Sequence, residues 1–143
     1  MSKTPDEFVY RATLDRIVDG DTFDCILDLG FDVKLHKQRV RLAGIDTPES
    51  RTRDLTEKWY GKQSKYFLEG LLKDQEIQLK SHGKGKYGRI LGELFVGASS
   101  YSINQHMIDS YHAVPYTGAS KELVEEQHLA NRQRLKEGGL HPE

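Results

Sequence analysis

Two strand-like segments that meet at a short acidic turn constrain the fold of this chain more than any other feature. Residues 9–18 and 22–29 are rich in β-branched and apolar residues, and Asp19-Gly20-Asp21 lies between them. Runs of this kind are typical of β-strands, and an Asp-Gly pair between two runs is typical of a turn. Residues 31–45 continue the strand-like pattern, so the first third of the chain is predicted to form a sheet.

The middle of the chain changes to a helical pattern and then returns to strands. Within residues 54–73, apolar side chains at positions 67, 68, 71 and 72 have the spacing of one helix face. Residues 76–80 alternate apolar with polar side chains, as a half-buried strand does, and residues 90–96 have the composition of its partner.

The last third of the chain predicts two more helices. Ile103, Met107 and Tyr111 form one helical stripe, and residues 121–136 form a further helix that ends at Gly138-Gly139. The order of strands, helix, two strands and two helices indicates an α+β protein. We expect helices packed against a small antiparallel barrel, as in the oligonucleotide-binding (OB) fold.

Length and cysteine content indicate one domain that needs no cross-links. The chain has 143 residues without a repeat, linker or low-complexity segment, so we expect a single domain over residues 1–143 with its core at about 10–140. Cys25 is the one cysteine, which excludes an internal disulfide bond. Free cysteine in a strand is most often a small buried residue.

Targeting signals are missing from the sequence as written. No apolar run approaches the length of a membrane span, and residues 1–7 lack the basic-then-apolar order of a signal peptide. We therefore expect no membrane partner and a cytoplasmic location, or secretion if a leader has been removed.

Charge is nearly balanced overall but unevenly distributed. The net charge of −1 counts against a nucleic-acid binder, since such proteins are often basic. Two stretches, residues 33–45 and 80–89, nevertheless hold four Lys or Arg residues each and no Asp or Glu. They are either solvated surface or a basic binding face hidden by the neutral average.

Three short segments carry residues suited to phosphate chemistry: Asp19-Gly20-Asp21-Thr22, the run from Arg41 to Glu49, and Lys86-Tyr87-Gly88-Arg89. Asp21 and Asp46 lie at the ends of predicted strands, where two carboxylates and a backbone carbonyl suit a hard cation such as Ca²⁺. Glu49 follows closely and is placed to hold a water molecule or accept its proton. Arg41 and Arg89 carry guanidinium groups that match phosphate geometry. Together these groups indicate a phosphoryl-transfer site.

Each segment alone has a simpler explanation. An Asp-Gly-Asp sequence is most often a turn, and Thr47-Pro48-Glu49 is most often the start of a helix. An isolated arginine in a strand is most often a solvated surface residue. Their joint occurrence in this order is what favours a functional site.

The same residues resemble the staphylococcal-nuclease (thermonuclease) family. The resemblance rests on Asp21, Arg41, Asp46-Thr47-Pro48-Glu49 and Lys86-Tyr87-Gly88-Arg89, and it continues through Tyr60-Gly61 and Glu126-Gln127-His128-Leu129. It covers roughly residues 10–140, and the motifs follow in the family's order. It implies an OB barrel of five strands with three α-helices.

The resemblance implies a role for each residue of the predicted centre. Asp21 and Asp46 would bind Ca²⁺ through their side chains and Thr47 through its carbonyl, with Asp19 in the outer shell. Glu49 would activate or orient the attacking water. The catalytic arginines that bind phosphate would be Arg41 and Arg89.

Substrate contacts follow from the same resemblance. Tyr87 would lie at the nucleotide phosphate and Tyr116 near the base. Independently of the resemblance, Lys84 and Lys86 of the basic stretch at 80–89 are expected to add positive charge for substrate binding. His128 is interpreted as structural.

A calcium-dependent nuclease of this type would hydrolyse phosphodiester bonds of DNA and RNA, leaving a 3′-phosphate and a 5′-hydroxyl. Single strands or locally opened duplexes are the expected substrates, because bases must reach tyrosine rings. We expect a monomer without an obligate protein partner. The alternatives are a non-catalytic nucleic-acid-binding OB module, an OB-fold binder of proteins or sugars, and a phosphatase of small esters. Loss of the carboxylates or arginines would mark the first, and none of the five is missing.

Overall fold

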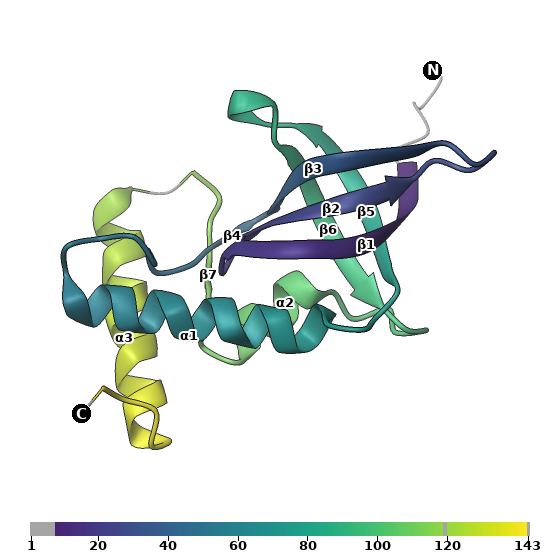
Figure 1. The fold of residues 1–143 in the computed structure, drawn as a ribbon. Coiled ribbons are helices and arrows are strands. Elements are labelled where there is room, and N and C mark those ends of the chain that lie inside the picture. The colour runs from purple at the N-terminus through teal and green to yellow at the C-terminus, as the bar shows by residue number, and fades with distance from the viewer. Residues whose placement is uncertain (1–7, 119, 143) are drawn as a thin grey trace.

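The computed structural model describes residues 8–118 and 120–142, apart from the side chain of Lys86. Within this range five strands close into a barrel in the order β1-β2-β3-β6-β5, shown in Figure 1. They are β1 (Phe8–Asp19), β2 (Thr22–Asp28), β3 (Lys34–Leu42), β5 (Ile77–Lys84) and β6 (Ile90–Val96). The expected five-stranded barrel is therefore confirmed.

The first two strands pair as the sequence predicts, with the acidic turn between them. β1 and β2 run antiparallel from Arg11 opposite Asp28 to Asp19 opposite Thr22. β2 then pairs with β3, and an irregularity between Cys25 and Leu27 places one extra residue in β3. Such a bulge bends the strand and strengthens its twist, which helps the sheet to close.

One expectation about the barrel is wrong. β3 and β6 close the barrel as a parallel pair, with Val40 opposite Ile90 and Leu42 opposite Gly92, so the barrel is mixed rather than antiparallel. A parallel pair needs a long crossover between its strands. Here the crossover contains a two-residue strand β4 (Ile45–Asp46), the first helix and β5, and strand composition alone carries no information about pairing direction.

Three helices accompany the barrel: α1 (Leu55–Leu72), α2 (Ile103–Asp109) and α3 (Lys121–Glu137). Each begins at a polar cap, Asp54, Ser102 or Ser120, whose side chain accepts hydrogen bonds from backbone N–H groups of the first turn. In Figure 1, α1 runs along one side of the barrel and α3 lies beyond one end of the barrel. The short strand β4 and its antiparallel partner β7 (Val114–Pro115) lie between the barrel and α3.

The second predicted helical stripe is shorter than expected. Ile103 and Met107 are buried on α2, but Tyr111 lies beyond the helix at a positive φ of 65° and is exposed. In the part of the chain that the structure describes, no helix has both the length and the apolar character needed to cross a membrane.

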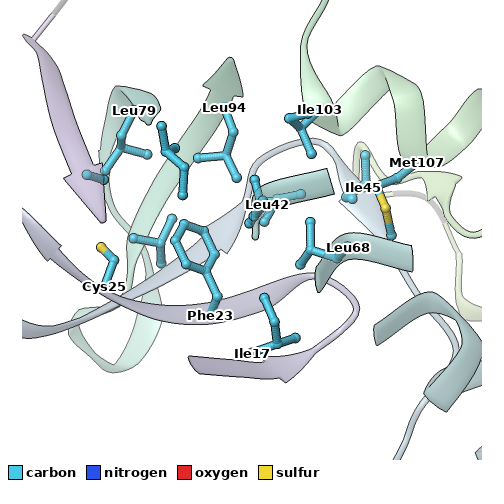
Figure 2. Close-up of a cluster of buried hydrophobic side chains, with 14 of the residues drawn as sticks. Ile17, Phe23, Cys25, Leu42, Ile45, Leu68, Leu79, Leu94, Ile103 and Met107 are labelled. Atoms are coloured by element: carbon cyan, nitrogen blue, oxygen red, sulfur yellow. The ribbon is translucent and has the colours of Figure 1, made fainter. Parts of the chain in front are cut away.

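The hydrophobic core joins the barrel interior to the helices, as Figure 2 shows. Phe23, Leu42 and Leu94 fill the barrel, while Leu68 from α1 and Met107 from α2 close its open end. Cys25 is fully buried in β2, as predicted, and burial raises the pKa of its thiol to about 12.

At the far end of β2 and β3 the strands continue into a protruding hairpin. Its turn places Phe31 and Asp32 at positive φ values of 55° and 61°, and the Val33 N–H donates to the Gly30 carbonyl at 2.9 Å. Phe31 is fully exposed. A bulky residue in the left-handed region costs roughly 1–2 kcal/mol, so this turn is not optimised for stability.

Candidate active site

A pocket of about 350 Å³ lies where the β1–β2 turn, the end of β3 and the loop after β4 meet. Its lining contains all six residues predicted for cation binding and catalysis, which are Asp21, Arg41, Asp46, Thr47, Glu49 and Arg89. Asp19, Thr22, Pro48, Ser50 and Arg51 complete the wall. Residues separated by up to seventy positions in sequence are thus brought to one site.

Close backbone approach positions the acidic turn. A Cβ atom on Gly20 would lie 2.7 Å from the Ser64 Cβ of α1, closer than Cβ atoms approach in proteins, and in tight contact with Thr47 at 3.1 Å. Glycine therefore lets the turn sit directly on the helix. The Leu42 N–H donates to the Asp21 carbonyl at 2.8 Å, which ties the turn to the end of β3.

Arg41 lies between the two predicted cation-binding carboxylates. Its Nη1 donates to the Leu42 and Ile45 carbonyls at 3.2 and 3.1 Å. Its Nη2 faces Asp21 Oδ2 at 3.5 Å and Asp46 Oδ1 at 3.4 Å. The backbone contacts of Nη1 fix the position of the guanidinium. The contacts of Nη2 with the two carboxylates are longer and weaker, so Nη2 can exchange them for a phosphate oxygen.

Asp21 is a buried carboxylate with incomplete charge compensation. Burial raises the pKa of Asp21 above its ordinary value, and the neighbouring Asp46 and Asp19 raise it further. Arg41 and a 2.9 Å hydrogen bond from the Thr22 hydroxyl offset only part of this. The site therefore favours an additional positive charge.

Asp46 receives a second contact that sequence reasoning did not reveal. His128 Nε2 lies 2.8 Å from Asp46 Oδ2, and the two residues are 82 positions apart. The interpretation of His128 as merely structural omitted this contact, because nothing in the local sequence shows which residue α3 faces.

The loop from Thr47 to Ser50 presents one exposed acid from a buried backbone. Thr47, Pro48 and Ser50 are buried, while the Glu49 side chain is exposed at the pocket. A Cβ atom on Gly61 of α1 would lie 2.4 Å from the Glu49 carbonyl oxygen. Gly61, a residue of the resemblance, therefore lets α1 support the loop directly.

Arg89 enters the pocket from the loop between β5 and β6. The Gly85 N–H donates to the Arg89 carbonyl at 2.7 Å, and the Arg89 guanidinium lies 5.9 Å from the Tyr87 ring. Its Nε is buried without a hydrogen-bond partner among the described residues. Tyr87 itself is 93% exposed at a φ of 63° within the short 3-10 turn η1 (Lys86–Gly88).

A larger neighbouring pocket of about 730 Å³ shares Arg41, Asp46, Glu49 and Arg89 with the first. Tyr116, which sequence reasoning placed near the base, lies in its wall with its ring 5.9 Å from the Arg41 guanidinium. Lys121 also lines this pocket. Sequence reasoning counted Lys121 only as the start of a helix.

Neither of the two lysines predicted to contact substrate, Lys84 and Lys86, is seen among the described residues that line the pocket. Lys84 is exposed at the end of β5 and lines neither of these pockets. The side chain of Lys86 lies outside the described residues. Lys84 therefore contributes charge near the Arg89 loop rather than a contact within the pocket.

The donor set fits a divalent cation. Asp21 and Asp46 are both held at Arg41, the Thr47 backbone is adjacent, and the buried Asp21 lacks full compensation. Among residues 8–118 and 120–142, no three His, Cys, Asp or Glu side chains form a ready metal cluster. A cation would therefore rely on two carboxylates, a carbonyl and water, an oxygen set that suits Ca²⁺.

This barrel with its pocket defines an OB-type protein of the staphylococcal-nuclease class. The family model described as "Staphylococcal nuclease homologue" matches residues 39–136, and the chain belongs to that family.

Named relatives agree with this assignment. The chain is 31% identical over 137 residues to a micrococcal nuclease of Shigella flexneri, covering 88% of this chain and 72% of the relative. It is 32% identical over 90 residues to a thermonuclease of Staphylococcus intermedius, covering 62% of this chain and 50% of the relative. It is 33% identical over 95 residues to endonuclease YncB of Bacillus subtilis, covering 64% and 42%. The chain thus spans about half the length of several relatives it matches.

Proposed function

We propose that this chain is a calcium-dependent nuclease that hydrolyses phosphodiester bonds of DNA and RNA. The observation that carries the proposal is the convergence of two carboxylates, two arginines and an exposed glutamate on one pocket. Membership of the family and the nuclease names of its relatives support it.

The residues divide the work by position. Asp21, Asp46 and the Thr47 carbonyl would hold Ca²⁺, which when bound supplies positive charge to a phosphate oxygen. Arg41 and Arg89 bind the same phosphate from two sides and bind it more tightly as charge develops in the transition state.

Glu49 aligns the attacking water and accepts its proton. The water oxygen forms a bond to phosphorus, and the bond from phosphorus to the 5′ oxygen breaks. The 5′ oxygen takes a proton from solvent and leaves as a hydroxyl, so the other product carries a 3′-phosphate. The larger pocket with Tyr116 then accepts a base, which favours single strands or opened duplex.

The test is digestion of single-stranded DNA and RNA with Ca²⁺, with Mg²⁺ and with excess chelator, followed by end-group analysis. We expect cleavage with Ca²⁺, poor cleavage with Mg²⁺, none in chelator, and 3′-phosphate ends. Full activity in excess chelator would refute the calcium mechanism.

Glu49→Gln separates an enzyme from a binding module. It is nearly isosteric and leaves Asp21 and Asp46 in place, so we expect a large fall in turnover with nucleotide bisphosphate affinity kept within about tenfold, or roughly 1.4 kcal/mol. A parent protein that binds DNA with Ca²⁺ present and never cuts it would favour the non-catalytic module. Cleavage of a mononucleotide ester but no polymer would favour the phosphatase.

A further inference from the structure

The two carboxylates of the predicted cation site are held by different means. Asp21 accepts a 2.9 Å hydrogen bond from its sequence neighbour Thr22, and Asp46 contacts His128 of α3 at 2.8 Å. Arg41 reaches both carboxylates, but only at 3.5 and 3.4 Å. Hydrogen bonds weaken at such distances, so the shorter contacts do most to orient the two groups.

From this geometry we infer that His128 is a positioning residue for the cation site: through Nε2–H it orients the Asp46 carboxylate toward Asp21. The inference rests on the proposed function, since it assigns His128 a role at the site that would hold Ca²⁺. Partners that hydrogen-bond metal-binding carboxylates typically change metal affinity by 10–100-fold when they are removed.

The surroundings of His128 make it a rigid partner. Its side chain is 9% exposed, and its Nδ1 has no hydrogen-bond partner among the described residues. A hydrogen bond to a carboxylate oxygen requires a ring proton on Nε2, so Nε2–H is the donor in this contact. Among the described residues, Asp46 is therefore the one polar partner of the ring.

Other contacts hold α3 in place independently of His128. Asn131 Nδ2 donates to the Ala113 carbonyl at 3.0 Å, and Arg132 Nη2 pairs with Glu57 of α1 at 3.2 Å. The Arg132 guanidinium also lies 5.5 Å from the Tyr60 ring. Loss of the His128 contact should therefore change the orientation of Asp46 without undocking the helix.

Three substitutions separate the contact from mere occupancy of the site. His128→Gln places its amide donor near the position of Nε2 and should keep the contact with Asp46. His128→Asn is also polar, but its amide lies near the position of Nδ1 and falls short. His128→Leu fills the space without a donor. A matched control is His82→Leu, which removes a histidine whose Nε2 lies 3.4 Å from Glu93, a residue outside the pocket.

The first measurement is Ca²⁺ binding to the full chain without substrate, by isothermal titration calorimetry. We expect His128→Leu and His128→Asn to weaken Ca²⁺ binding by about tenfold or more, and His128→Gln and His82→Leu to stay close to the parent. In the turnover assay, the activity of His128→Leu should recover in large part at saturating Ca²⁺, because Asp46 itself is still present.

Each other outcome has a distinct meaning. If the parent binds no Ca²⁺, the proposed function itself fails. If the parent binds and His128→Leu and His128→Asn bind equally well, only the inference fails. If circular dichroism shows both variants unfolded while His128→Gln is folded, the contact holds the fold rather than the cation site, which also overturns it.

Discussion

The two sides of the pocket differ in how firmly they are built. On the carboxylate side, each group has a hydrogen bond that ties it to the fold. Arg41 donates to β3, Asp21 accepts from Thr22, and Asp46 contacts α3. On the loop side, Arg89 has a buried Nε without a partner among the described residues, and Tyr87 is almost fully exposed. The first side is organised before any ligand arrives, whereas the second has hydrogen-bonding capacity left for one.

If the proposed function holds, this difference predicts a division between stability and catalysis. Groups tied into the fold contribute to folding as well as to chemistry, so their removal should change both. A loop side chain with an unused donor gains its partners from the substrate, so its removal should change chemistry alone.

Arg41→Ala and Arg89→Ala give the largest effects and test the comparison directly. Each should lower turnover on the order of 10²-fold or more, because each loses positive charge in the transition state. Only Arg41→Ala should also lower the free energy of unfolding, by about 3 kcal/mol without Ca²⁺, because the buried Asp21 loses its partner.

Turnover assays and urea unfolding of the same preparations measure the two quantities. Equal stability loss in both variants would contradict the division between the two sides. Unchanged turnover in Arg89→Ala would place the phosphate elsewhere.

Gly61→Ala tests whether α1 supports the loop that carries Glu49. The added methyl group would collide with the Glu49 carbonyl, so we expect a loss of about 1–3 kcal/mol in the free energy of unfolding and a fall in turnover. Gly70→Ala on the same helix is the matched control, since its added Cβ meets nothing within 4 Å. The control should be neutral or stabilising by up to about 1 kcal/mol. Full activity in Gly61→Ala would show that the loop adapts.

His112, which packs on α1 away from the pocket lining, makes the stability of the fold depend on pH. Burial lowers the pKa of His112 to about 4, so the unfolded chain binds more protons between pH 6.5 and 4 and stability falls as the pH falls through this range. We expect His112 to lower the free energy of unfolding by roughly 2 kcal/mol over this range. His112→Phe keeps the stacking on Phe67, whose ring centroid is 4.5 Å away, and should reduce the loss. Urea unfolding at pH 7 and 4.5 measures the free energy of unfolding that each protein loses on acidification. Equal losses in the parent and in His112→Phe would exclude the effect.

The smallest effect concerns charge beside the loop side. Lys84→Ala combined with Lys86→Ala should flatten the dependence of log affinity on log salt by roughly 0.7–1.4 for single strands, one to two phosphate contacts. Lys62→Ala combined with Lys136→Ala, two exposed helical lysines, is the control and should leave the slope unchanged. Equal slopes in parent and test variant would place the binding face elsewhere.

Local sequence predicted the parts of this molecule whose signal is local. The β1–β2 turn, the apolar face of α1 and the end of α3 at Gly138 follow from turn chemistry, helical spacing and capping. Asp21, Arg41, Asp46, Glu49 and Arg89 were predicted as one site from their chemistry and from the family resemblance, and the structure brings them to one pocket.

What local sequence could not provide is information about partners distant in the chain. The parallel pairing of β3 with β6 depends on how the whole barrel closes. The contact of His128 with Asp46 and the approach of Gly61 to Glu49 depend on where helices dock. Tyr111 fitted a helical stripe by spacing, but the chain leaves the helix before reaching it.

The protruding β2–β3 hairpin offers a place to attach other molecules to this protein. Thr22 and Arg41 are paired at the pocket end of these strands, and the turn at Phe31 lies at the opposite end of β2, about 20 Å along a seven-residue strand. The turn is exposed and closed by its own backbone hydrogen bonds. Exposed turns of this kind tolerate insertions well. A peptide tag, dye or surface tether introduced between Phe31 and Asp32 should therefore leave the pocket accessible, and it would relieve the left-handed conformation of Phe31 at the same time.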